Sequence, residues 1–288
     1  MSKGLLDPKV DFVFKNIFGS PNHPEILISF LNATLKAKKK IVNVDIKKTD
    51  IEKQYIEDKY SRLDVKATTS NDEIINIEIQ LKNENNMVKR SLYYLSKMYE
   101  EQLNEKEDYS KLVRTVCINI LNFKYLKTDN FHTGYRFKEI ESNEELTDIM
   151  EVHFIEIPKL QDSSDEKDML VAWTEFLKDP ESEKVRGLEL SIEEIRQAKD
   201  ELIRMSNDST QRELYDMRAN SLRDKMSELN AAERKGIEKG REEGRKEGIE
   251  EGRKEEKIKI ARNMKLSGLD TNTIAKITNL SEDEIDKL

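Results

Sequence analysis

The chain has 288 residues, of which 36% are hydrophobic and 38% are charged, and its formal net charge is −8. This length suffices for one large domain with an appendage or for two domains. The hydrophobic content is thin for a single globule, so we expect a highly solvated helical section. No apolar run reaches the roughly 18 residues that a transmembrane helix needs, which argues against a membrane span.

The cysteine and histidine positions indicate the cellular compartment and limit the possible metal sites. Cys117 is the single cysteine, so no disulfide can form within the chain, which fits a reducing compartment. The first residues lack a charged-then-apolar leader. We therefore expect a cytoplasmic protein that does not associate with a membrane. His23, His132 and His153 lie far apart in the sequence and give no zinc-finger spacing.

Charge is unevenly distributed along the chain. Residues 1–127 contain 22 Lys and Arg against 18 Asp and Glu, whereas residues 128–288 contain 28 against 40. The first part is therefore mildly basic although the whole chain is acidic. Since contact with phosphate depends on the local potential, the negative net charge does not exclude a nucleic-acid partner.

The predicted elements follow in chain order. An Asp7-Pro8 start, with Asp7 as N-cap and Pro8 in the first turn, predicts a first helix that ends at Gly19. Apolar periodicity predicts further helices over residues 24–36 and 87–103. Strand patterns span residues 41–46, 62–68, 74–82, 113–123, 135–140 and 152–157. After Pro158 the pattern becomes helical, and a long polar helix is predicted from Ser209.

The strand patterns over residues 62–68 and 74–82 place polar side chains on one face. In the first, Asp64 and Lys66 alternate with apolar residues. In the second, Glu78 and Gln80 alternate with isoleucines that point to the core. If the two strands pair, two carboxylates, an amide and an amine gather on one sheet face. Carboxylate oxygens are hard ligands that suit Mg²⁺ or Mn²⁺.

A second interpretation of the same pattern stays open. A hairpin with one solvated face alternates in the same way, and Asp, Glu and Lys are typical of that face. A short motif is therefore compatible with an ordinary wet surface as well as with a metal site.

A longer resemblance favours the metal site. The matching residues are Asp11–Gly19, Arg62–Val65, Asn76–Gln80, Arg90, Tyr94, the apolar strand Thr115–Leu121 and the Gly-periodic tail. In these the chain resembles the Rpn family of recombination-promoting nucleases and transposase-like proteins, a branch of the PD-(D/E)xK nuclease superfamily. The resemblance covers most of the chain and is strongest from Asp7 to Phe123.

The resemblance implies a fold and a domain order. The pattern alone predicts α/β or α+β. The resemblance implies a restriction-endonuclease-like αβββαβ core with a mixed sheet, followed by a long C-terminal helical extension. We expect a nuclease-like domain over residues 1–205, a Gly-periodic charged helix over 206–262 and a small helical module over 263–288.

The resemblance also implies a metal site. Asp64 and Glu78 would bind Mg²⁺, or else Mn²⁺ or Ca²⁺, with the Ile79 carbonyl as a further oxygen ligand. Gln80 stands where the wider superfamily usually has Lys, although the Rpn family itself shows Glu-x-Gln. Its amide cannot act as a base, but it can orient a water molecule or ligate the ion. Asp11 is an expected outer carboxylate.

Basic and aromatic side chains complete the expected site. Lys66 and Lys82 share the predicted face and could supply the missing cation, with Lys66 as the better candidate because it lies two residues from Asp64. Arg90 and Tyr94 lie one turn apart on a helix, and they suit either a phosphate clamp or structural packing.

The implied reaction is metal-dependent hydrolysis of a DNA phosphodiester, in connection with recombination or mobile elements. The main alternative is a non-catalytic protein that keeps the nuclease fold for binding or assembly. A strand-joining transposase is a third interpretation, and nothing in the sequence indicates it. RNA as substrate stays open, because phosphate chemistry does not distinguish it from DNA.

The tail carries two further patterns. Glycine recurs at every fourth residue from Gly236 to Gly252, which suits either a homotypic helix contact, and so a homo-oligomer, or a solvated helix held by charged pairs. Residues 271–286 resemble a helix-turn-helix. Its second helix contains Glu282, Asp283, Glu284 and Asp286, which would repel phosphates. We therefore expect a protein-contact module there.

Overall fold

The computed structural model describes residues 4–36, 39–47, 65–165 and 167–288. The chain divides into two compact units, Met1–Ser221 and Leu222–Leu288, which are described separately. Asp64, with the first residues of the strand predicted over 62–68, lies outside the described residues.

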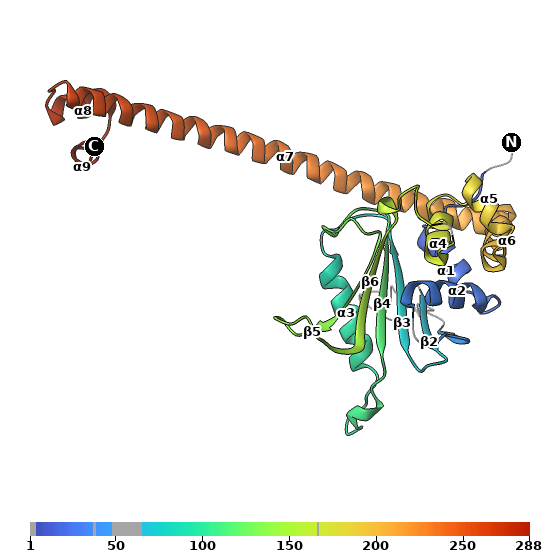
Figure 1. Cartoon of the computed structure of the whole chain (residues 1–288). Coiled ribbons are helices and arrows are strands. Elements are labelled where there is room, and N and C mark those ends of the chain that lie inside the picture. Colours follow the sequence, from blue (N-terminus) through green and yellow to red (C-terminus); the bar gives the residue numbers. More distant parts are fainter. Residues whose placement is uncertain (1–3, 37–38, 48–64, 166) are drawn as a thin grey trace. The chain divides into compact units, whose positions relative to one another are not determined.

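The first unit is built on a six-stranded mixed sheet (Figure 1). The strand order is β1-β2-β3-β4-β6-β5, so β3, β4 and β6 lie inside the sheet and β5 forms one edge. β3, β4 and β6 are parallel to one another, and the outer pairings are antiparallel. The strands are β1 Val44–Lys47, β2 Val65–Thr69, β3 Ile74–Gln80, β4 Thr115–Leu121, β5 His132–Lys138 and β6 Glu145–Glu156.

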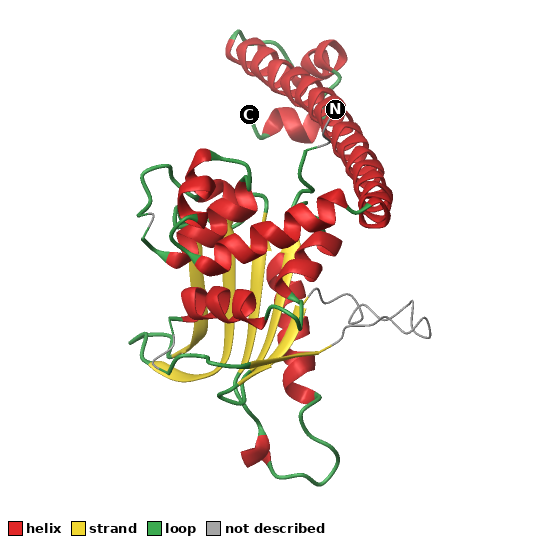
Figure 2. Cartoon of the chain, turned by 90° about the vertical axis from the view of Figure 1, so that its right-hand side faces the viewer, coloured by secondary structure: helices red, strands yellow, loops and turns green. Residues whose placement is uncertain are grey.

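Helices cover both faces of this sheet. α3 packs on β4 and β6 from one side. On the other side α1 contacts β3 and α2 contacts β1, while α4, α5 and α6 extend this helical layer (Figures 1 and 2). The helices are α1 Asp11–Phe18, α2 Pro24–Leu35, α3 Met87–Glu100, α4 Met169–Lys178, α5 Glu183–Glu189 and α6 Glu193–Asn207.

Aromatic packing joins the helical layer. Trp173 of α4 is fully buried, and its ring lies edge-on to Phe18 at 5.3 Å between centroids. Phe30 and Phe176 pack against the same indole, and the indole Nε1 donates to Ser29 Oγ at 3.2 Å. The helical segment after Pro158 therefore packs on the core, and Trp173 is a packing residue.

Several predicted boundaries are wrong: β5 spans His132–Lys138 and not 135–140, β6 begins at Glu145 and not at Val152, and two further cases have a clear local cause. The first helix begins at Asp11 and not at Asp7, because the Asp7 carboxylate accepts from Lys9 N at 2.9 Å and closes a turn instead of capping a helix. The strand predicted from Ile41 begins at Val44. Asn32 Nδ2 donates to the Ile41 carbonyl at 2.8 Å, and Asn32 Oδ1 accepts from Ile41 N at 2.9 Å, so Ile41 bonds to α2 and not to the sheet.

The solvated-face interpretation of β3 is also wrong. Asn76 and Glu78 are 0% exposed, and Ile77 is 1% exposed. Both faces of β3 are therefore covered, as expected for a strand inside a mixed sheet. A polar side chain on the α3 side of this strand is a buried polar group and needs a partner.

The second unit contains most of the long helix α7 (Ser209–Leu266), with α8 (Thr271–Thr278) and α9 (Glu282–Asp286). Its small core consists of Ala261, Ile274, Leu280 and Ile285. Ser281 and Glu284 form the predicted capping box at the start of α9. In the described ranges no helix combines the length and the apolar character needed to span a membrane.

Replacing Ile285 by Ala should unfold the α8–α9 module alone. Ile285 is 0% exposed, and truncating such a side chain costs about 2–4 kcal/mol, which a core this small cannot absorb. Amide hydrogen exchange should show loss of protection over residues 271–286 with the sheet unchanged. Ile277, 59% exposed, provides the matched control: Ile277→Ala should leave protection intact. Equal loss in both variants would contradict this core assignment.

Candidate active site

The Glu78 carboxylate lies buried between β3 and α3. Its side chain is 1% exposed, and its Oε2 accepts from Arg90 Nε at 3.2 Å. β3 positions Glu78 because β2 and β4 flank it on both sides, and the alternation of the strand turns Glu78 away from the isoleucine face. The sequence therefore places a carboxylate where water is largely excluded.

Arg90 reaches Glu78 from the first turn of α3. Its guanidinium carbon lies 5.4 Å from the centre of the Tyr94 ring, one turn further along the helix. The Arg90 side chain is 22% exposed, so the guanidinium also faces solvent. Arg90 thus connects the buried carboxylate with the surface.

The surroundings of Glu78 disfavour its ionised form. Burial raises the pKa of Glu78 to about 7, against the lowering effect of the Arg90 charge. Within the described part of the chain, Glu78 Oε1 is buried and has no hydrogen bond of good geometry, although the nearby Asn76 side chain also lowers the pKa of Glu78. A divalent cation beside Oε1 would satisfy this oxygen and lower the pKa, so the site fits the hard ion that the sequence predicts.

Further polar groups on the α3 side were not predicted from the sequence. Asn119 of β4 is the lateral neighbour of Glu78. Its Oδ1 accepts from Ser91 Oγ at 2.9 Å and its Nδ2 donates to the His153 carbonyl at 3.1 Å. An Asn inside an otherwise apolar strand was the available signal, since a buried amide must be satisfied.

Cys117 lies on the same face as Asn119. Asn76 Nδ2 is 3.9 Å from the Cys117 sulfur. Burial raises the pKa of Cys117 to about 12, so this thiol stays protonated and is a core residue, as predicted.

The structure brings only part of the predicted site together. Lys66 lies on β2 opposite Asn76, and its Nζ is 3.9 Å from Glu101 Oε2 at the end of α3. Gln80 is the half-buried last residue of β3. Ile79 turns its side chain to the opposite face of β3 and is 5% exposed. Lys82 follows in the loop after β3.

The two predicted aspartates have different outcomes. Asp64 falls outside the described residues, so its proposed pairing with Glu78 stays a prediction. Asp11 is the first residue of α1, and its Oδ2 accepts from Arg218 Nη1 of α7 at 3.2 Å. No contact between Asp11 and Glu78 occurs among the described residues, and no three His, Cys, Asp or Glu there are arranged to hold one ion.

The first unit is an α/β domain with a mixed sheet, a buried carboxylate on an inner strand and one covering helix that carries a basic side chain. Residues 8–232 match the family model of the PD-(D/E)XK nuclease family transposases. Residues 254–288 match the C-terminal HTH domain of the Rpn/YhgA-like nuclease family. Searches of curated proteins and of solved structures gave no significant match. The chain therefore belongs to the PD-(D/E)XK nuclease family transposases, with an Rpn-type C-terminal helix-turn-helix domain.

These matches confirm the family resemblance and the fold class. They also bear on the C-terminal module, for which the sequence predicted protein contact. Helix-turn-helix domains characteristically bind DNA, which supports DNA as the partner. The exposed Glu282, Asp283 and Asp286 of α9 still predict that α9 itself does not lie against phosphates.

Proposed function

We propose that the chain is a divalent-metal-dependent endodeoxyribonuclease in which Asp64 and Glu78 hold the ion. The observation that supports this most is the burial of the Glu78 carboxylate on an inner strand, where its Oε1 has no hydrogen bond of good geometry from any residue that the structure describes. A structural carboxylate in that position would be fully satisfied by its neighbours. Mg²⁺ is the proposed ion, with Mn²⁺ or Ca²⁺ as substitutes, and the Ile79 carbonyl and Asp11 are further proposed participants.

The ion would supply a water molecule of lowered pKa and would neutralise charge on the scissile phosphate. The protein's own groups then have separate tasks. Gln80 carries no charge, so we assign its amide to orienting the attacking water. Glu78 keeps a carboxylate in a dry environment, where it interacts strongly with a cation.

The basic group facing the phosphate is assigned to Arg90. The sequence favoured Lys66, but Lys66 points toward Glu101, whereas Arg90 donates to Glu78 and also reaches solvent. A planar guanidinium can bind two phosphate oxygens at once. Tyr94 supports the Arg90 side chain through its ring face. Lys66 and Lys82 stay proposed contributors to phosphate binding.

Cleavage of supercoiled plasmid tests the proposed activity. Purified protein with Mg²⁺ or Mn²⁺ should nick or linearise the plasmid, and EDTA should prevent this. Asp64→Ala should lower the rate by roughly 100-fold or more, because an ion ligand is removed. Asp129→Ala, at an exposed position, should cleave like the wild type.

Plasmid that stays intact with every ion, or equal cleavage by Asp64→Ala, would contradict the nuclease proposal. Either result would favour the non-catalytic alternative, for which Gln80 in the usual lysine position is the supporting observation. In that case the same fold would bind DNA or assemble without cutting it.

We also propose a role for each part of the chain. Residues 1–205 would form the nuclease-like domain, 206–262 the helical connector and 263–288 the terminal module, in a cytoplasmic protein. Self-association would use the α7 row from Gly236 to Gly252, where an added Cβ meets no other atom within 4 Å. Light scattering tests it: Gly244→Leu should reduce the mass of an oligomer, while Lys246→Leu should not.

A further inference from the structure

Two of the three histidines meet on the sheet face opposite Glu78. His132 of the edge strand β5 and His153 of β6 lie with His132 Nε2 2.9 Å from His153 Nδ1. His153 and Ile77 share a face through the lateral register with Ile118, whereas Glu78 belongs to the other face. This pair is therefore separated from the proposed nuclease site by the sheet itself.

A buried carboxylate fixes the His153 ring from behind. His153 Nε2 lies 2.7 Å from Glu151 Oε1, and both side chains are about 5% exposed or less. Glu151 also accepts from Arg114 and Arg136. A carboxylate paired with two guanidinium groups accepts hydrogen bonds, so the 2.7 Å contact places the His153 ring proton on Nε2 and turns the Nδ1 lone pair toward His132.

Gly134 of β5 leaves space for the His153 ring. A Cβ at Gly134 would lie 3.1 Å from His153 Cε1 and 3.2 Å from His153 Nδ1. Any side chain there would therefore press on the ring beside Nδ1, the nitrogen that faces His132 Nε2. Glycine at 134 leaves the space that the ring needs in this position.

We propose that His132 Nε2 and His153 Nδ1 form a binding site for a borderline divalent transition metal ion such as Zn²⁺. Two nitrogens at about 2.0–2.1 Å from one ion lie about 2.9 Å apart at a right angle and about 3.3 Å apart in a tetrahedral site. The observed 2.9 Å needs little or no opening. For the ion to bind, the His132 proton would move from Nε2 to Nδ1 by tautomerisation, so that both facing nitrogens offer a lone pair, and water would fill the other positions.

The surroundings suit a nitrogen-ligated cation. A carboxylate behind a metal-ligating imidazole is the usual arrangement, since it fixes the tautomer and raises ligand basicity. The charged groups near His132 include Lys36, Asp168 and Glu151. Lys36 is itself paired with Asp168 at 3.2 Å, and Arg136 with Glu145 at 2.9 Å, so the nearby charges are offset.

The site differs in chemistry from the Glu78 site. Imidazole nitrogens select zinc, nickel or copper, whereas carboxylate oxygens select Mg²⁺. His132 is half-buried, which gives the ion a way in. A bound ion would fasten the edge strand β5 to β6 through side chains in addition to the backbone ladder.

Calorimetric titration of the tag-free full chain with ZnCl₂, in excess Mg²⁺, tests this site. We expect one Zn²⁺ per chain with nitrogen ligation. His132→Gln should weaken binding by roughly 10- to 100-fold or more, because a direct ligand is lost. His23→Gln is the matched control, since His23 is the third histidine and contacts Glu25 on α2. It should bind Zn²⁺ like the wild type.

Gly134→Ala provides a second variant that keeps both ligands. It should weaken Zn²⁺ binding at least several-fold while circular dichroism shows an intact fold. Absence of a Zn²⁺ heat in the wild type, or unchanged affinity in folded His132→Gln, would overturn the proposal. Plasmid cleavage with Mg²⁺ alone should be unaffected by His132→Gln. The titration measures Zn²⁺ binding and not cleavage, so it tests this site even if the nuclease proposal fails.

Discussion

Replacing Glu78 by Gln should stabilise the metal-free protein while abolishing metal-dependent cleavage. The pKa of Glu78 is raised from 4.5 to about 7 by burial, and one pKa unit corresponds to about 1.4 kcal/mol. At pH 7.5 the ionised side chain therefore lowers the free energy of unfolding by about 2–3 kcal/mol. Gln has the same shape without the charge, so most of this penalty disappears.

The pH dependence follows from the sign of the shift. The folded state holds the Glu78 proton more tightly than the unfolded state, so raising the pH from 4.5 to 7 costs stability. Wild type and Glu78→Gln should be equally stable near pH 4, and the gap should open through this window and then stay constant. Urea unfolding in EDTA at several pH values measures it.

Two controls make this result specific. Glu101→Gln changes a carboxylate that is 36% exposed and should alter stability by less than about 0.5 kcal/mol. Adding Mn²⁺ should stabilise the wild type and have no effect on Glu78→Gln, since binding to the folded state adds stability. A Glu78→Gln protein that is less stable than the wild type at pH 7.5 would refute the buried-charge account. The loss of the Arg90 contact is small because Arg90 reaches water.

Much of the fold could be predicted from the sequence because its signals are local. The period-two pattern identified β3, and the apolar run Thr115–Leu121 identified an inner strand. The start of α1 was misplaced because Asp7 can cap a helix or close a turn, and only the tertiary contacts decide. Leu6 N donates to Ser206 Oγ at 3.0 Å and Lys9 Nζ donates to the Leu177 carbonyl at 3.0 Å, and these distant contacts hold the segment in the turn.

The sites depend on distant contacts and were harder to predict. Glu78 was identified from its strand, but its pairing with Arg90 depends on how α3 lies across the sheet. His132 and His153 are 21 residues apart, so sequence spacing gave no metal pattern. The β5–β6 register brings them together, and register is set by the whole sheet rather than by local sequence.

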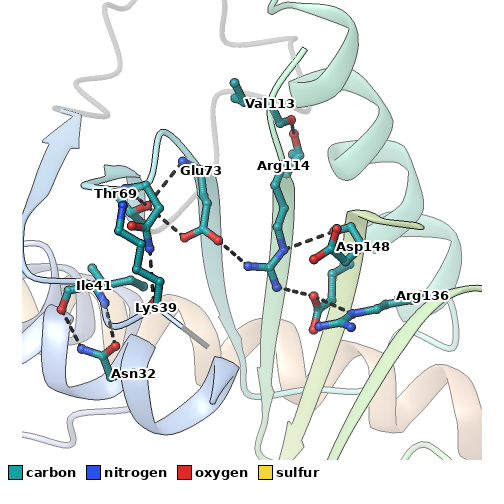
Figure 3. Close-up of polar contacts among 12 residues, drawn as sticks. Asn32, Lys39, Ile41, Thr69, Glu73, Val113, Arg114, Arg136 and Asp148 are labelled. Atoms are coloured by element: carbon teal, nitrogen blue, oxygen red, sulfur yellow. Dashed lines mark hydrogen bonds and ion pairs between the residues drawn. The ribbon is translucent and has the colours of Figure 1, made fainter. Parts of the chain in front are cut away.

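Arg114→Met should be among the most destabilising single changes in the first unit. The guanidinium lies between two buried carboxylates: Nη1 donates to Glu73, Nη2 donates to Glu151, and Nε donates to the Asp148 carbonyl at 3.2 Å (Figure 3). Glu73 and Glu151 are 7% and 4% exposed. Removing one partner of a buried ion pair costs about 3–5 kcal/mol, because the remaining charge is left uncompensated.

A graded set of variants separates this charge effect from loss of packing. Lys111→Met, at an exposed cation paired with Glu107, should change the free energy of unfolding by less than about 0.5 kcal/mol. Adding Glu73→Gln to Arg114→Met should restore part of the loss, since one uncompensated charge disappears. An Arg114→Met deficit that is independent of Glu73 would mean that packing, and not the buried charge, makes Arg114 necessary.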